Sequence, residues 1–117
     1  MLSRERMQNL FLEMIQIYSP SKGEKDMADF IEAYLAKRGI QFQSDNAGEG
    51  YGGNGRNIVA HIPGTKEGIP LGFAAHMDQI EPCRDVKAVI DANIIRTDGT
   101  TTLGGDDKSG IAAILEA

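Results

Sequence analysis

The sequence is poor in the residues that disulfide-rich and thiolate metal proteins require. Its 117 residues include a single cysteine, Cys83, so neither an internal disulfide framework nor a cluster of thiolate metal ligands can form. It also lacks a run of about 18 apolar residues for a membrane span, and its first residues lack the apolar core of a signal peptide. These absences predict a cytoplasmic protein without a membrane partner.

Positive charge is scarce as well. Lysine and arginine number 12 against 17 aspartates and glutamates, and the formal net charge is −5. Nucleic-acid binding depends on cations that neutralise phosphates, so the composition predicts no nucleic-acid partner. The length suits one domain with a hydrophobic core but not two.

Two segments near the start carry apolar residues at the three- and four-residue spacing of one helical face. The first helix is expected to begin after Ser3, a candidate N-cap. The second is expected to end at Lys37-Arg38-Gly39, because cations and a left-handed glycine are typical of a helix end. The apolar positions are Met7, Leu10, Phe11, Met14, Ile15 and Tyr18 in the first helix, and Met27, Phe30, Ile31, Tyr34 and Leu35 in the second.

Short apolar segments follow and are expected to form strands. Residues 71–75 are apolar at nearly every position, so this strand is expected to be covered on both faces. The glycine-rich residues 45–55 are expected to be a flexible loop. The other expected strands are 40–43 and 57–62, with a hairpin formed by 86–90 and 94–97. Helices and strands in this order predict an α/β fold.

A last helix is expected from Lys108 to Ala117, where no glycine, proline or basic turn marks its end. This pattern predicts that residues 1–117 are the N-terminal portion of a longer catalytic domain that is truncated within a helix.

His76 and Asp78 directly follow the most apolar strand, where ligands and catalytic groups gather in open α/β sheets. A histidine at a strand end is more often structural. In an extended segment, however, Asp78 lies on the same side as His76, and its carboxylate can accept the second imidazole N–H. Such a hydrogen bond fixes the tautomer of a metal-ligating histidine. His76 is therefore a candidate zinc ligand.

Asp106 and Asp107 lie between Gly104-Gly105 and the last helix. An aspartate at this position usually caps a helix. Two adjacent aspartates exceed what a cap needs, so one is expected to cap while the other reaches a cation.

Two other residues are expected to have no catalytic role. His61 has no carboxylate neighbour to orient it, which favours an exposed strand end. Cys83 has Arg84 beside it, but neither a helix start nor a histidine lies close in sequence, which favours a plain loop thiol.

The chain resembles the dinuclear zinc exopeptidase family that includes peptidase T, carboxypeptidase G, aminoacylase and succinyl-diaminopimelate desuccinylase. The likeness is strongest to peptidase T. It depends on two motifs in this order, Phe73 to Asp78 and Ile95 to Ala112. The resemblance implies a three-layer α/β fold in which a central mixed sheet carries helices on both faces.

The same resemblance implies a site with two zinc ions as cofactors. His76 would bind one zinc, Asp78 would be the catalytic residue that orients it, and Asp106 would bridge both metals, since the family motif reads Asp-x-Lys and Asp107 fills its variable position. Two such ions, about 3.5–4 Å apart, activate a water and polarise the scissile carbonyl. The resemblance further suggests a cis peptide between Asp106 and Asp107. Gln79 departs from the family, in which threonine is common after His-x-Asp.

The expected activity is cleavage of the N-terminal residue from short peptides by the full-length protein, a tripeptide aminopeptidase. In relatives, the general base and the remaining ligands come from an adjacent Glu-Glu pair, a further acid and a late histidine. None of these is present in this chain, so the chain alone is expected to be inactive. A homodimer, formed through a domain absent from this chain, is also implied. The alternatives are an amidohydrolase of the same family that acts on acylated amino acids, and a non-catalytic α/β interaction module.

Overall fold

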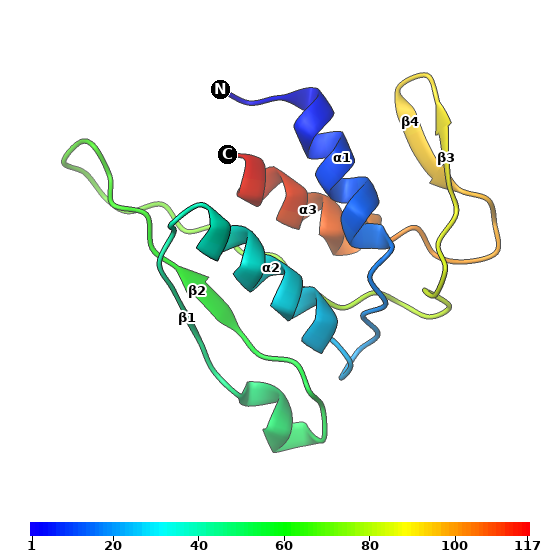
Figure 1. The fold of residues 1–117 in the computed structure, drawn as a ribbon, viewed down its shortest axis with the longest axis horizontal. Helices are drawn as coiled ribbons and strands as arrows, with labels where there is room; N and C mark the ends of the chain where they lie inside the picture. Colours follow the sequence, from blue (N-terminus) through cyan, green and yellow to red (C-terminus); the bar gives the residue numbers. More distant parts are fainter.

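The structure, a computed structural model, describes all of residues 1–117. Three helices lie beside one another, with α1 next to α3, and two small strand pairs flank them (Figure 1). None of the helices is long and apolar enough to cross a membrane. The α/β class expected from the sequence is confirmed. The elements are α1 (Arg4–Ile15), α2 (Lys25–Lys37), β1 (Phe42–Ser44), the 3-10 helix η1 (Ala47–Tyr51), β2 (Ile58–Ala60), β3 (Ala88–Asp91), β4 (Ile94–Thr97) and α3 (Gly105–Glu116).

Both N-terminal helices form in the segments that the apolar spacing predicts, although α1 ends at Ile15, before Tyr18. Ser3 is the N-cap of α1, and its side-chain oxygen accepts the Arg6 backbone N–H at 3.2 Å. Gly39 has a φ of +68° after α2, the left-handed conformation that glycine adopts without a steric penalty. The predicted cap and the predicted glycine stop are both confirmed.

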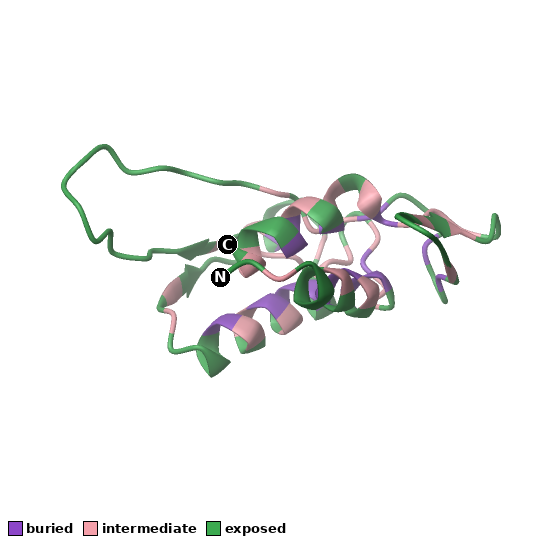
Figure 2. Cartoon of the chain, turned by 90° about the horizontal axis from the view of Figure 1, so that it is seen from above, coloured by how far each residue is buried: buried purple, intermediate pink, exposed green.

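The hydrophobic core lies between the three helices. Figure 2 shows the buried residues on the helix surfaces that face the interior. Burial of one such side chain stabilises a fold by about 1.5–3 kcal/mol. The core residues are Leu10, Phe11, Met14 and Ile15 of α1, Met27, Ile31 and Leu35 of α2, Val86 before β3, and Ile111 and Ala112 of α3.

The strands form two separate antiparallel pairs. In the first, Phe42 of β1 lies opposite Ala60 of β2. In the second, Ala88 of β3 lies opposite Thr97 of β4, which confirms the predicted hairpin. No strand pairing joins the two sheets, so a single central mixed sheet does not form within these residues.

The prediction of a buried strand at residues 71–75 is wrong for this structure. None of its backbone hydrogen bonds involves this segment, and the side chains of Leu71 and Phe73 are 83% and 73% exposed. Residues 59–74 are exposed throughout, and they form the long outlying segment of Figure 2. An apolar run favours a strand, but a strand also needs a neighbour, and no other segment of the chain pairs with this one.

Residues 45–55 differ from the flexible loop that their glycines predicted. They contain η1, and Asp45 organises both ends of the connection. Its carboxylate accepts the backbone N–H groups of Ala47 at 3.0 Å and Asn57 at 2.8 Å, and the Asn57 side-chain amide at 2.8 Å. These bonds lower the pKa of Asp45, with the Ala47 N–H as the largest cause.

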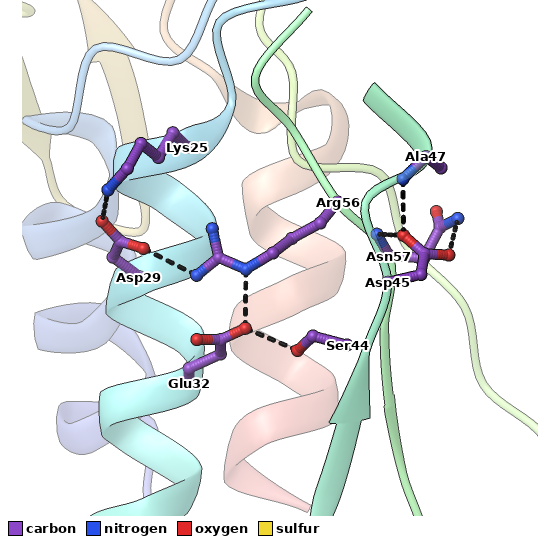
Figure 3. Close-up of polar contacts among 8 residues, drawn as sticks. All are labelled: Lys25, Asp29, Glu32, Ser44, Asp45, Ala47, Arg56 and Asn57. Atoms are coloured by element: carbon purple, nitrogen blue, oxygen red, sulfur yellow. Dashed lines mark hydrogen bonds and ion pairs between the residues drawn. The ribbon is translucent and has the colours of Figure 1, made fainter. Parts of the chain in front are cut away.

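Arg56 ties this connection to α2 (Figure 3). Its Nε lies 2.7 Å from Glu32 Oε1, and its Nη2 lies 2.6 Å from Asp29 Oδ1. Glu32 also accepts the Ser44 hydroxyl at 2.5 Å. The Arg56 guanidinium therefore holds the start of β2 against the side of α2. The Ser44 hydroxyl holds the end of β1 against the same helix.

Candidate metal centre

His76 and Asp78 lie together at the end of the exposed segment, in the relation expected from the sequence. His76 Nδ1 is 2.9 Å from Asp78 Oδ1 and 3.1 Å from the Asp78 backbone oxygen. The other carboxylate oxygen of Asp78 accepts the Ser21 hydroxyl at 2.5 Å. Asp78 therefore orients the imidazole and is itself held by the connection between α1 and α2.

Asp106 completes the group from a distant part of the sequence. His76 Nε2 lies 2.8 Å from Asp106 Oδ1, across a separation of 30 residues. The Asp106–Asp107 peptide is cis, as the resemblance suggested, and Gly104 before it has a φ of +91°. The structure thus brings together all three residues predicted for the site, while their roles in metal binding stay predictions.

Asp107 points elsewhere. Its Oδ1 accepts the Gly110 backbone N–H at 3.2 Å, which is the contact of an N-cap side chain with the third residue of a helix. Regular helical geometry in α3 begins only after Asp107, since Asp106 and Asp107 have non-helical φ and ψ angles. One aspartate caps the helix and the other reaches His76.

Two carboxylates near His76 raise the pKa of its imidazole. The hydrogen bond to Asp106 is the largest cause, burial acts in the opposite direction, and the negative charge of Asp78 raises the pKa further. The Ser21 hydroxyl, with a smaller contribution from His76, lowers the pKa of Asp78. The side chains of His76 and Asp106 are 50% and 87% exposed, so an ion from solvent has free access to both.

Lys108 anchors the second motif to Ile17 and Gln79. Its side chain is fully buried, and its Nζ donates to Ile17 O at 2.8 Å and to Gln79 Oε1 at 2.9 Å. Burial lowers the pKa of Lys108 to about 8. The lysine therefore attaches the start of α3 to the α1–α2 connection and to the residue that follows Asp78.

The chemistry of the donors fits zinc, but their number does not fit a complete site. An imidazole nitrogen and a carboxylate are common zinc ligands, and a stable site has three or four protein ligands. The chain supplies His76 and Asp106, while Asp78 faces the other imidazole nitrogen. It contains no group of three or more histidine, cysteine, aspartate or glutamate side chains arranged to hold a metal ion. These residues could therefore supply only part of the ligand set that a zinc site needs.

An open cavity of about 500 Å³ adjoins His76. One wall comes from the segment that carries the predicted site, and the other from Glu24, just before α2, and the connection between β1 and β2. The sequence analysis missed this second wall, because the positions of its residues depend on Asp45 and Arg56 rather than on a local motif. The lining residues are Glu24, Tyr51, Gly55, Arg56, Asn57, Ala74, Ala75, His76, Met77, Asp78 and Asp107.

The two residues that were expected to lack a role lie outside the group. His61 is exposed directly after β2, and its backbone N–H donates to Gln41 O at 3.4 Å. Cys83 is 1% exposed, and burial raises the pKa of its thiol. Arg84 stacks on the Tyr18 ring instead of facing the thiol. The exposed position expected for His61 is confirmed, and the absence of a catalytic role for either residue stays a prediction.

Comparison with solved structures shows the same backbone in two peptidases. A crystal structure of a tripeptidase from Staphylococcus aureus matches 99% of this chain and 31% of its own chain, with a TM-score of 0.92 and 33% sequence identity. Aminopeptidase PepT from Bacillus cereus matches 98% of this chain and 31% of its own, with a TM-score of 0.91 and 32% identity. The chain resembles peptidase T. No family model matches the chain.

Sequence relatives agree with the structural match. The protein YqjE of Bacillus subtilis is 34% identical over all 117 residues of the chain, which cover 32% of YqjE. Peptidase T of Photobacterium profundum is 35% identical over 66 residues, 55% of this chain and 16% of that protein. The resemblance to peptidase T predicted from the two motifs is confirmed, and the chain spans about a third of the length of the relatives that match it over most of its length.

Proposed function

We propose that the whole polypeptide to which this chain belongs is a zinc-dependent aminopeptidase that removes the N-terminal residue from short peptides, as a tripeptidase does. The observation that carries the proposal is the backbone match to a tripeptidase with a TM-score of 0.92. The convergence of His76, Asp78 and Asp106 from two separate motifs supports it.

In this proposal the residues of the chain hold and orient the metal. His76 would bind through Nε2, Asp106 would bind through its carboxylate, and Asp78 would keep the proton on Nδ1 and thereby raise the basicity of the ligating nitrogen. Zinc supplies Lewis-acid polarisation of the scissile carbonyl and activation of the attacking water. Asp107, by capping α3, would hold the backbone of Asp106 in place.

The cavity beside His76 is the proposed place for the peptide. Its lining includes the polar residues Glu24, Tyr51 and Asn57 together with residues 74–77. Peptides need both polar and apolar contacts for orientation in a site. A short peptide, rather than a folded protein, suits a hollow of about 500 Å³.

The test uses the whole polypeptide, purified with and without bound zinc. We expect it to contain zinc and to cleave a tripeptide with a free amino terminus, and we expect a chelator to abolish cleavage. The substitution His76→Ala removes a proposed ligand and should abolish both zinc retention at this position and turnover. Asp78→Asn, which weakens the orientation of His76, should lower metal affinity or activity about 10- to 100-fold.

The control is His61→Ala, since His61 is exposed and lies outside the site. This variant should retain zinc and full activity. Tripeptide cleavage by His76→Ala at the wild-type rate would contradict the proposal. Cleavage of N-acylated amino acids but not of free tripeptides would support the amidohydrolase alternative, and absence of both zinc and hydrolysis would support the non-catalytic module.

Several expectations remain predictions alongside this proposal. The 117 residues alone should show no peptidase turnover with added zinc, because they offer two protein ligands where a stable site has three or four. The cytoplasmic location, the placement of residues 1–117 within a larger catalytic domain and the homodimer also stay predictions.

A further inference from the structure

Gln79 connects the segment of His76 and Asp78 to the segment of Asp106. It is 2% exposed and immediately follows Asp78. Its Oε1 accepts Lys108 Nζ at 2.9 Å. Its Nε2 donates to the Thr102 hydroxyl at 3.0 Å and to the Thr102 backbone oxygen at 3.3 Å. One side-chain amide therefore contacts residues on both sides of Asp106.

The backbone of the second motif passes close to the Gln79 side chain at Gly104. A Cβ atom at Gly104 would lie 2.6 Å from Gln79 Oε1, which is closer than nonbonded atoms approach one another. Gly104 also has a φ of +91°, a conformation that suits glycine. The Gly104 turn thus leaves room for the glutamine amide.

Both motifs are also attached to one common support, the connection between α1 and α2. The Gln79 backbone N–H donates to Ser19 O at 2.8 Å, and Lys108 Nζ donates to Ile17 O at 2.8 Å. Ser21 holds Asp78 from the same connection. With Gln79 between them, the two motifs are joined directly as well as through this support.

We propose that Gln79 is a positioning residue that holds the His76 segment and the Asp106 segment in the register that brings His76 Nε2 to the Asp106 carboxylate. A buried polar group left without its partner costs about 1–3 kcal/mol. The bonds of Gln79 are therefore satisfied together only when Lys108 and Thr102 hold their observed positions. Asp106 lies between these two residues in sequence, so the same register places it opposite His76.

The identity of the residue matters for this role. The resembled family commonly has threonine at this position, and a threonine hydroxyl is too short to reach Lys108 and Thr102 simultaneously. The link described here belongs to the glutamine of this chain. Its use in placing zinc ligands depends on the proposed function, but the register of His76 and Asp106 does not.

The experiment measures the His76–Asp106 contact in the metal-free chain by NMR. The ring nitrogens of its two histidines are labelled with ¹⁵N and observed at one fixed pH. Asp106→Asn should shift the His76 ring signals and leave those of exposed His61 in place. The same comparison is made in the background of Gln79→Met, since methionine is of similar size but lacks the amide. There the change in the His76 signals caused by Asp106→Asn should be at least about twofold smaller than in wild type. Such a double-mutant comparison isolates the coupling between the two positions.

Gln16→Met is the matched control. The Gln16 side-chain amide donates to Val86 O at 2.8 Å, so this variant also removes a long-range glutamine contact, but one whose two partners belong to neither motif. It should leave the His76 response to Asp106→Asn unchanged. An equally large response in the Gln79→Met and wild-type backgrounds would overturn the proposal.

Should Gln79→Met fail to fold, Gln79→Glu decides the question. Glutamate keeps the acceptor for Lys108 and loses the two donations to Thr102, so we expect a reduced response, and an undiminished one would overturn the proposal. Because no metal is present, a failure here is distinct from a failure to find zinc or peptidase activity.

Discussion

Asp106 and Asp107 are neighbours in the sequence, yet their carboxylates contact different parts of the molecule. Asp107 accepts the Gly110 N–H within its own helix, and Asp106 reaches the His76 imidazole. The first contact is local and stabilises the start of α3, whereas the second is long-range and largely exposed to solvent. The two residues should therefore differ in their effects on stability.

Asp107→Ala should destabilise the fold by about 1 kcal/mol, since it removes an N-cap side chain. Asp106→Ala should change the free energy of unfolding by less than about 0.5 kcal/mol, because exposed side chains away from caps contribute little. Urea unfolding of both variants measures the difference. Equal destabilisation by the two substitutions would show that Asp107 is not the cap.

At the scale of elements, ion pairs join α2 to the segment that leads into β2. Arg56 contacts Asp29 and Glu32 of α2, and the Glu32 side chain is only 24% exposed. The hydrogen bond from Arg56, followed by that from Ser44, lowers the pKa of Glu32 below its ordinary value of 4.5.

This shift predicts the direction of a pH effect on stability. A carboxyl whose pKa is lower in the folded state stabilises the fold above its ordinary pKa and loses this contribution as the pH falls through the folded value. The free energy of unfolding should therefore decrease as the pH falls from about 5 towards 3, and the decrease should be smaller in Glu32→Gln. Denaturant unfolding across this range is the measurement.

The matched control for this element is Glu13→Gln, which changes an exposed glutamate of α1. It should leave the acid dependence of wild type unchanged. If Glu32→Gln showed the full wild-type loss of stability in acid, the Arg56–Glu32 contact would not contribute to the junction.

At the scale of the whole molecule, apolar side chains lie both in the core and on an exposed segment. Those of the three helices form the core, whereas Ile69, Leu71 and Phe73 stand in the exposed segment before His76. Exposed apolar groups that lie close together favour association with other surfaces. The segment should therefore affect how the chain associates rather than how stably it folds.

Phe11 and Phe73 provide a matched pair for this distinction. Phe11 is 8% exposed and Phe73 is 73% exposed. Phe11→Ala should cost about 3–5 kcal/mol of unfolding free energy, and Phe73→Ala less than about 0.5 kcal/mol. Sedimentation velocity should show weaker self-association of Phe73→Ala than of wild type. A stability loss from Phe73→Ala as large as that from Phe11→Ala would mean that residues 71–75 are buried in solution.

Much of the fold could be predicted from short stretches of sequence. The core faces of α1 and α2, the Ser3 cap, the Gly39 stop and the β3–β4 hairpin all depend on residues within a few positions of one another. The contact of His76 with Asp78 was predictable for the same reason. The resemblance to peptidase T followed from two such local motifs.

The remaining features depend on residues that are far apart in the sequence. The contact of Asp106 with His76 joins two distant segments. The same is true of the contacts by which Arg56 orders a glycine-rich connection and of those by which Gln79 joins the two motifs. The sequence by itself determined where helices and turns form and which chemical groups stand at the candidate site, because local backbone preferences and apolar spacing act over a few residues. Only the tertiary structure decided which of those groups meet and that residues 71–75 lie unpaired, because strand pairing and side-chain contact require a second segment in the right position.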